Sequence, residues 1–128
     1  MSKALQDIQK REIVETLKIF NPQLIILFGS YVSQNAIGQS DIDIGFFTQK
    51  KVDNLQRWEI QERIASRLLV DVDLVDMSSA NDVLNFQIVS TGEVLYKKDE
   101  MYAESFMDRV YTKYLQLNED RKEILECY

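Results

Sequence analysis

Apolar residues recur along this chain with two periods, one typical of amphipathic helices and one typical of buried strands. From residue 2 to residue 20 they return at every third or fourth position, which is the helical period. The inner face of this predicted helix consists of Leu5, Ile8, Ile13, Leu17 and Phe20. Asn21 and Pro22 end it, because proline disfavours helical conformation in the residue before it. Residues 23–28 then form a nearly uninterrupted apolar run, as expected of a buried strand.

The rest of the chain continues to alternate between helices and strands. Gly29 and Ser30 break the first strand, and Ser30 is placed to cap a short helix to about residue 35, with a loop over residues 36–40. Further strands are predicted over residues 41–47, 70–77 and 93–96. Further helices are predicted over residues 54–69, over residues 81–89 and from residue 99 onward. This alternation predicts one domain with an α/β or α+β layer fold.

Local residue choices mark the boundaries and inner faces of these elements. Ser78 and Ser79 offer a cap for the helix over residues 81–89, and Gly92 permits the turn into the last strand. The helix over residues 54–69 is expected to bury Leu55, Trp58, Ile64 and Leu68. The C-terminal helix is expected to bury Phe106, Val110, Tyr114 and Leu117. Each of these helices thus presents one apolar stripe to the rest of the fold.

The second predicted strand carries two aspartates that need an explanation. Asp41 and Asp43 alternate with Ile42 and Ile44, so the carboxylates share one face of the strand and the isoleucines share the other. Two like charges side by side repel each other and raise the pKa of at least one carboxyl group. A divalent cation would remove this repulsion, because hard cations prefer carboxylate oxygens. The same pattern also fits an edge strand whose aspartates simply face water and deter aggregation.

The third predicted strand repeats this pattern. Residues 70–74 place Asp71 and Asp73 on the face opposite three apolar side chains. If the two strands are neighbours with their apolar faces together, Asp73 joins the first pair of aspartates around metal ions. We interpret Asp71 as a solvated residue at the strand end and Asp76 as a turn residue.

A glycine-serine turn precedes these carboxylates by ten residues. Gly29 allows the backbone to approach a ligand closely, and amides at a helix start together with the Ser30 hydroxyl form an anion site. A Gly-Ser turn between a strand and a helix is also common as a simple cap. Its spacing to Asp41 and Asp43 favours a phosphate site beside a metal site, which are the parts needed for phosphoryl or nucleotidyl transfer.

The composition narrows the chemistry further. The 128 residues include no histidine and one cysteine, Cys127. Ser-His-Asp triads, Cys-His dyads, histidine-ligated zinc and disulfide frameworks are therefore excluded. Any metal must bind to oxygen ligands, which favours Mg²⁺, Mn²⁺ or Ca²⁺.

The charge balance limits the partners. Fifteen basic residues against twenty-one acidic residues give a net charge of −6, which disfavours long nucleic acid and anionic membranes. The longest apolar run, residues 24–28, is too short to cross a bilayer. Because the first residues lack the apolar core of a signal peptide, we expect the protein to be cytoplasmic.

Taken together, these motifs resemble the signature of the DNA polymerase β-like nucleotidyltransferase superfamily. Its parts are Gly29-Ser30-Tyr31 followed after a short gap by Asp41-Ile42-Asp43. Residues 72–76 and 87–96 resemble the minimal nucleotidyltransferase (MNT) branch, so the resemblance covers about residues 10–97. The C-terminal helix, residues 99–127, resembles an extension of MNT antitoxins, which are encoded beside HEPN-domain ribonuclease toxins. We therefore expect residues 1–128 to form a single nucleotidyltransferase domain with a mixed sheet flanked by helices.

The resemblance implies a specific activity and site. Asp41, Asp43 and Asp73 would bind two Mg²⁺ ions, and Asp73 would be the candidate base. Gly29 and Ser30 would hold the triphosphate of ATP. AMP would pass to a tyrosine hydroxyl of the HEPN toxin, which would neutralise the toxin, and the two proteins would form a hetero-oligomer. HEPN toxins use an active-site histidine, so a chain without histidine would be the antitoxin.

One departure from the family pattern leaves other functions open. Many relatives carry Arg-Gly soon after Gly-Ser-Tyr, where this chain has Ser33-Gln34. A weakened triphosphate site would suit a non-catalytic antitoxin that acts by binding and occlusion. A third possibility is a small-molecule nucleotidyltransferase of the aminoglycoside-modifying kind.

Overall fold

A four-stranded mixed sheet forms the centre of the computed structural model, which describes residues 5–33 and 40–126. The strands are β1 (Leu24–Phe28), β2 (Ile42–Phe47), β3 (Val72–Asp76) and β4 (Glu93–Lys97). Their order across the sheet is β3-β2-β1-β4. β1 pairs antiparallel with β2 and with β4, whereas β2 and β3 pair in parallel. The predicted α/β layer fold with a mixed sheet is thus confirmed.

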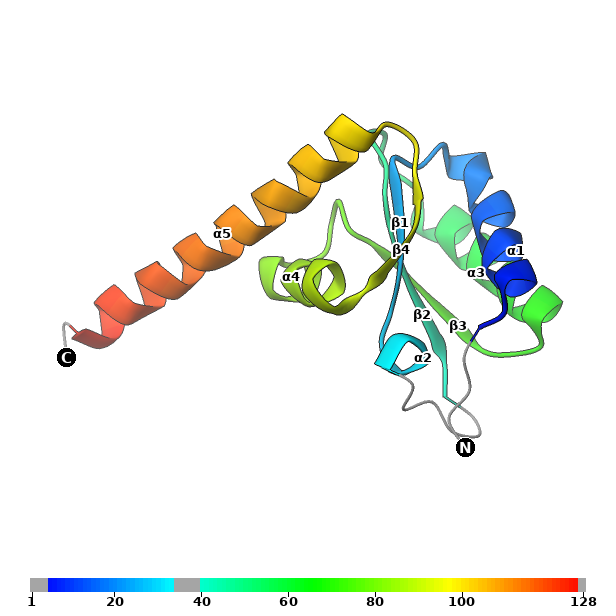
Figure 1. The fold of residues 1–128 in the computed structure, drawn as a ribbon, viewed down its shortest axis with the longest axis horizontal. Helices are drawn as coiled ribbons and strands as arrows, with labels where there is room; N and C mark the ends of the chain where they lie inside the picture. Colours follow the sequence, from blue (N-terminus) through cyan, green and yellow to red (C-terminus); the bar gives the residue numbers. More distant parts are fainter. Residues whose placement is uncertain (1–4, 34–39, 127–128) are drawn as a thin grey trace.

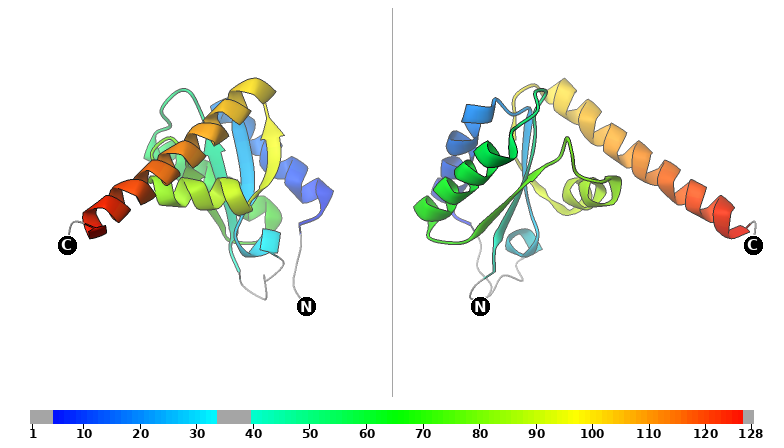
Figure 2. Two further views of the ribbon diagram at one scale, coloured as in Figure 1. Left: turned by 60° about the vertical axis from the view of Figure 1, so that its left-hand side comes forward. Right: turned by 180° about the vertical axis from the view of Figure 1, so that it is seen from behind.

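Helices cover both faces of this sheet. They are α1 (Asp7–Leu17), the short 3₁₀ helix η1 (Lys18–Phe20), α2 (Ser30–Ser33), α3 (Asn54–Leu68), α4 (Asp82–Thr91) and α5 (Glu100–Glu126). α1 and α3 lie side by side on one face, and α4 and α5 lie on the other (Figures 1 and 2). The sheet is therefore buried on both sides over much of its length, which explains the continuous apolar run in β1.

The alternation of side chains along the strands builds two apolar clusters. One lies under α1 and α3 and includes Ile13, Leu17, Ile25, Leu27, Ile42, Ile44, Phe46, Ile60, Ile64, Val72 and Leu74. The other lies under α4 and α5 and consists of Leu24, Ile26, Met77, Ile88, Ala103, Phe106 and Val110. Consecutive strand residues thus serve opposite clusters, as the period of two requires.

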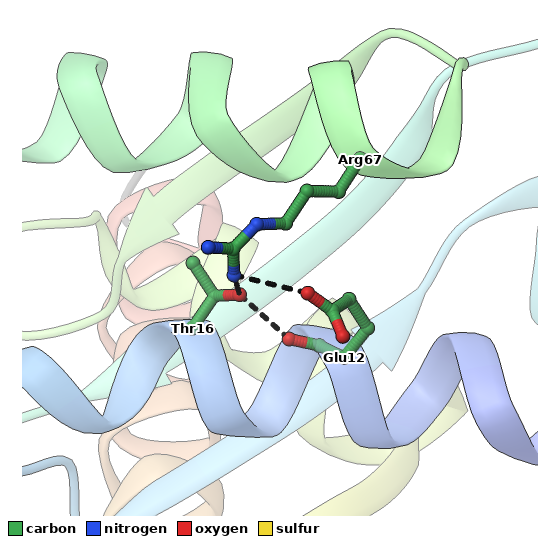
Figure 3. Close-up of polar contacts among 3 residues, drawn as sticks. All are labelled: Glu12, Thr16 and Arg67. Carbon is green, nitrogen blue, oxygen red and sulfur yellow. Dashed lines mark hydrogen bonds and ion pairs between the residues drawn. The ribbon is translucent and has the colours of Figure 1, made fainter.

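A polar contact ties the two helices of the first face together. Arg67 of α3 donates through Nη1 to Glu12 Oε1 at 3.0 Å and to Thr16 Oγ1 at 2.8 Å, both on α1 (Figure 3). The Thr16 hydroxyl in turn donates to the Glu12 carbonyl at 2.8 Å. This three-residue group holds α3 against α1, and its hydrogen bonds join residues of these two helices only.

The C-terminal helix projects from the sheet. Its first half packs on the second cluster through Ala103, Phe106 and Val110, and its far half extends away from the strands (Figure 1). The Asp99 carboxylate starts the helix by accepting from the Tyr102 amide at 3.0 Å. At mid-helix, Tyr114 stacks on Phe86 of α4 with ring centroids 3.8 Å apart. No helix in residues 5–33 and 40–126 is long and apolar enough to cross a bilayer.

Several predicted boundaries shift in the structure. The first α-helix begins at Asp7 and ends as a 3₁₀ helix, and the third strand covers residues 72–76 instead of 70–77. The short helix α2 begins at Ser30. The predicted continuation of this helix to residue 35 and most of the following loop lie outside the described residues. These shifts leave the order and type of the described elements as the sequence predicted.

Two predictions about local residues were wrong. Asn81 caps α4 through Oδ1, which accepts from the Leu84 amide at 2.8 Å, whereas the Ser78 amide and hydroxyl both donate to the Asp76 carboxylate. The expected inner residues Ile8, Leu55 and Trp58 are 71%, 60% and 53% exposed. In α3 the predicted Ile64 is fully buried and Leu68 packs against the core, but Ile60 takes the place expected of Leu55 and Trp58. Helical periodicity identifies apolar positions but not which of them meet the sheet.

Gly92 joins α4 to β4 where there is no room for a side chain. A Cβ placed there would overlap the Ile26 side chain and the Ile88 carbonyl, and would lie 2.9 Å from the Leu27 carbonyl. We expect Gly92→Ala to lower the free energy of unfolding by about 2–3 kcal/mol, since backbone must move to accept the methyl group. Urea unfolding measures this change. The control is Ser90→Ala at an exposed position two residues earlier in α4, which should stay within about 0.5 kcal/mol of the parent. Equal effects of the two changes would contradict the steric explanation.

Candidate active site

The predicted acidic residues come together at one end of the sheet. Asp43 on β2 and Asp73 on β3 are direct partners in the parallel register, and Asp41 immediately precedes the first residue of β2. Asp41 and Asp73 are exposed, and Asp43 is half-buried. The condition stated from sequence, that the two acidic strands are neighbours, is therefore met. Asp71 is exposed just before β3 begins, as the sequence suggested.

The packing of β2 explains why Asp43 faces this side. Ile42 and Ile44 are fully buried under α1 and α3, so the side chain between them must point to the opposite face. On that face, Ile88 of α4 lies 3.1 Å from where a Cβ on Gly45 would stand. Asp43 lies two residues before Gly45, beyond this apolar cover. The carboxylate is thus partly desolvated but still open to solvent.

Gly29 brings the turn after β1 directly against this carboxylate. Phe28, the last residue of β1, is the register partner of Asp43. Gly29 has a φ of +80°, and a Cβ built on it would overlap Asp43 Oδ2 and lie 3.1 Å from Asp43 Cγ. Both the backbone conformation and the lack of space therefore require glycine here. The sequence suggested that Gly29 admits a ligand but missed that it makes room for Asp43.

The residues after Gly29 anchor the turn. The Val32 amide donates to the Gly29 carbonyl at 3.1 Å, and Tyr31 is buried in the cluster under α1 and α3. Ser30 begins α2 between these two anchors. Of the pair that departs from the family pattern, Ser33 ends the described part of α2 and Gln34 lies outside the described residues. The structure thus places Gly29 against the Asp43 carboxylate, and Ser30 follows it as the first residue of α2.

The electrostatics of Asp43 mark it as the strained member of the group. Burial, followed in size by the negative charges of Asp73 and Asp41, raises the pKa of Asp43 from 3.8 to about 6. The described residues contain no cationic partner in hydrogen bond or ion pair with Asp43. An ionised Asp43 at neutral pH therefore carries uncompensated repulsion.

The donor set of this site fits a hard cation. Three carboxylates from two adjacent strand ends supply oxygen ligands, and the raised pKa of Asp43 shows that their charges act on one another. Among residues 5–33 and 40–126, no three acidic side chains are already gathered as ligands around one point. Asp41 and Asp73 are exposed, so their carboxylates have room to change rotamer. The site accordingly offers the right groups for a cation without presenting a closed cage.

Comparison with known proteins identifies similar sequences over almost the whole chain. Residues 11–101 match the family described as Polymerase beta, Nucleotidyltransferase. The chain is 36% identical over 127 residues to Protein adenylyltransferase MntA of Shewanella oneidensis (strain ATCC 700550 / MR-1). This alignment covers 95% of the present chain and 88% of MntA. The similarity thus includes both the carboxylate strands and the C-terminal helix.

Solved structures agree at the level of the fold. A chain in the crystal structure of a toxin-antitoxin with AMP-PNP superimposes with a TM-score of 0.83 at 36% identity, covering 91% of this chain and 95% of that one. A second is from the complex of tri-AMPylated Shewanella oneidensis HEPN toxin with MNT antitoxin. It has a TM-score of 0.80 at 35% identity and covers 95% of this chain and 97% of that one. At this identity and coverage, the likeness extends over almost the whole chain.

The raised pKa of Asp43 predicts a pH dependence of stability. The folded chain binds a proton at Asp43 near pH 6, and the unfolded chain does so only near pH 4, so this group favours folding at low pH and loses that contribution as pH rises from about 4 to 6. Asp43→Asn removes the carboxylate and therefore the loss of stability that its ionisation causes. Because the carboxylate is partly exposed, we expect a gain of about 1 kcal/mol at pH 7, well below the ideal value for a buried group.

Urea unfolding between pH 4 and pH 7.5 in EDTA measures this difference. The gain from Asp43→Asn should vanish toward pH 4 and be complete above pH 6.5. Asp71→Asn is the control for loss of one exposed carboxylate. A gain that is the same at every pH would show that Asp43 is not strained by its charge.

Proposed function

The chain belongs to the Polymerase beta nucleotidyltransferase family, and on that premise we propose that it is an antitoxin that transfers AMP from ATP to a HEPN-domain toxin. The observation that carries the proposal is the apposition of Asp43, Asp73 and the Gly29 turn at one end of the sheet. Its similarity to MntA, named a protein adenylyltransferase, supports AMP as the group transferred. The similar chains in toxin complexes with AMP-PNP, or with a tri-AMPylated toxin, support ATP as donor and the toxin as acceptor.

The three carboxylates at this end of the sheet are the proposed metal ligands. We propose that Asp41, Asp43 and Asp73 hold Mg²⁺, as two ions. When bound, Mg²⁺ would lower the pKa of the attacking hydroxyl and balance the charge of the leaving pyrophosphate. It would also remove the repulsion at Asp43 that the metal-free protein carries.

The protein's own groups position and deprotonate the reactants. Gly29 and Ser30 orient the triphosphate through the close approach of the turn to Asp43. The acceptor hydroxyl, which we propose belongs to a tyrosine of the toxin, attacks the α-phosphorus of ATP. A new oxygen–phosphorus bond forms, the bond to the β-phosphate oxygen breaks, and pyrophosphate leaves. Asp73, the more exposed partner of Asp43, takes the hydroxyl proton.

The remaining expectations about the protein follow this assignment. We propose a single domain with its core over about residues 10–97 and the helical extension over residues 99–127, acting in a hetero-oligomer with the toxin. The use of ATP as the donor favours a cytoplasmic location.

The aminoglycoside-type alternative gains no support, since the similar proteins are named for modification of a protein. Neutralisation by occlusion remains the second candidate, because α5 projects from the sheet with Leu115 62% exposed and available to a partner.

Removing the paired carboxylates tests the enzymatic mechanism. We expect Asp41→Asn with Asp43→Asn to reduce transfer of labelled AMP from ATP to the toxin by at least about 10³-fold, since a metal-ion site supplies several kcal/mol of transition-state stabilisation. Circular dichroism should show the fold intact. Asp71→Asn removes an exposed carboxylate from the same end of the sheet and should transfer AMP at the parent rate. Full labelling by the double variant would refute the assignment.

Withdrawing the metal separates catalysis from occlusion. If the protein neutralises by AMP transfer, unmodified toxin mixed with it in EDTA or without ATP should keep its ribonuclease activity, because the hydroxyl is then never modified. If it neutralises by binding, ribonuclease activity stays low under both conditions. Mass analysis of the toxin after reaction should show added AMP on a tyrosine; AMP on another residue type would correct the acceptor.

A further inference from the structure

β3, the strand that carries Asp73, is an edge strand. It pairs with β2 only, so the backbone groups on its other side have no strand partner. Leu74 follows Asp73 directly and is only 2% exposed. A buried N–H or C=O group without a hydrogen-bond partner destabilises the fold, so both backbone groups of Leu74 need a partner from elsewhere.

Two side chains of α3 supply these partners. The Leu74 amide donates to Gln61 Oε1 at 2.9 Å, and Arg57 Nη1 donates to the Leu74 carbonyl at 3.1 Å. Residues 57 and 61 are one helical turn apart, so both side chains leave the same face of α3. We call this pair the β3 clamp (Arg57 and Gln61). It takes the place of a neighbouring strand at one residue of the sheet edge.

The β3 clamp acts on the backbone of Asp73. The Leu74 amide lies in the same rigid peptide plane as the Asp73 carbonyl, so the bond to Gln61 orients that plane. On its other side, Asp73 is held by the parallel register opposite Asp43. The backbone of Asp73, from which its carboxylate extends, is therefore fixed relative to Asp43 from both edges of β3. A catalytic constellation needs such precision, since displacements of about 1 Å can cost about 100-fold in rate.

We propose that Gln61 and Arg57 are positioning residues that hold Asp73 in place for AMP transfer. This inference rests on the proposed function of Asp73. The β3 clamp touches neither the three carboxylates nor the Gly29 turn in any recorded hydrogen bond of the described residues. It acts through the strand, and its loss should impair the chemical step more than the binding of ATP.

Arg67 provides a matched control on the same helix. Like the β3 clamp, it donates hydrogen bonds from α3, one of them part-buried, but its partners Glu12 and Thr16 are on α1 and not on β3 (Figure 3). Arg67→Met should therefore lower stability without moving Asp73. Gln61→Met removes the acceptor of the Leu74 amide, and Gln61→Glu keeps an oxygen in the same place.

The experiment measures AMP transfer to the toxin and hydrogen exchange at Leu74 in the full chain. We expect Gln61→Met to lower kcat roughly 10–100-fold with little change in the KM for ATP, because Asp73 loses its alignment. Gln61→Glu should recover kcat to within about threefold of the parent, since an acceptor is restored. The Leu74 amide should exchange faster in Gln61→Met than in the parent, and Arg67→Met should leave both kcat and this exchange unchanged.

Other outcomes would overturn the inference. Parent kcat in Gln61→Met, or an equal loss of kcat in Arg67→Met, would show that the β3 clamp has no special link to Asp73. Failure of the proposed function looks different: the parent chain would transfer no AMP, or Asp73→Asn would keep the parent rate. The positioning role would then fall with that function, while the exchange of the Leu74 amide would still report whether the clamp bond exists.

Discussion

The register that β2 keeps with its two neighbours is the constraint on which the rest of the structure depends. Ile42 and Ile44 are fully buried, so a slip of one residue would turn both into the opposite face and bring Asp43 into the core. The same register sets Asp43 opposite Asp73 on β3 and opposite Phe28 on β1. Through Phe28 it also sets the position of Gly29, which is the residue that leaves space for the carboxylate. Apolar packing on one face thus determines the placement of charge on the other.

This arrangement concentrates an unfavourable interaction where the chemistry is expected. Asp43 is partly desolvated and lies near two like charges, which raises its pKa, and no basic side chain is bonded to it within the described residues. Elsewhere the chain uses opposite charges in ordinary ways, as in the Arg67–Glu12 contact between α3 and α1. A site that binds a cation and a triphosphate gains from such repulsion, because the ligand relieves it. The repulsion at the site lowers the stability of the fold, and the two apolar clusters on the faces of the sheet compensate for it.

The sequence predicted the described elements, their order and the residues at the polar end, since each rests on a short local pattern. Alternation identified the faces of β2 and β3, and the single Pro22 and the glycines marked the breaks. The predictions that failed needed knowledge of distant neighbours. Leu55 and Trp58 fit a helical period together with Ile64, but only Ile64 of these three is buried, and Ile60 is buried beside it. Ser78 has a residue type typical of a helix cap, but it donates to the Asp76 carboxylate, and Asn81 caps α4 instead.

By itself, the sequence determined the chemistry that this protein can perform. A chain with no histidine and one cysteine has no histidine-based chemistry and leaves oxygen ligands for any metal, and Gly29, Asp41 and Asp43 stand within one short segment. Only the tertiary structure decided that Asp73 stands opposite Asp43, that Gly29 is excluded from bearing a side chain by that same aspartate, and that α3 holds the edge of β3. The physical reason is the distance along the chain over which each interaction acts. Side-chain alternation and residue type act within a few residues, whereas strand pairing and edge protection join segments that are separated by tens of residues and meet only when the sheet has formed.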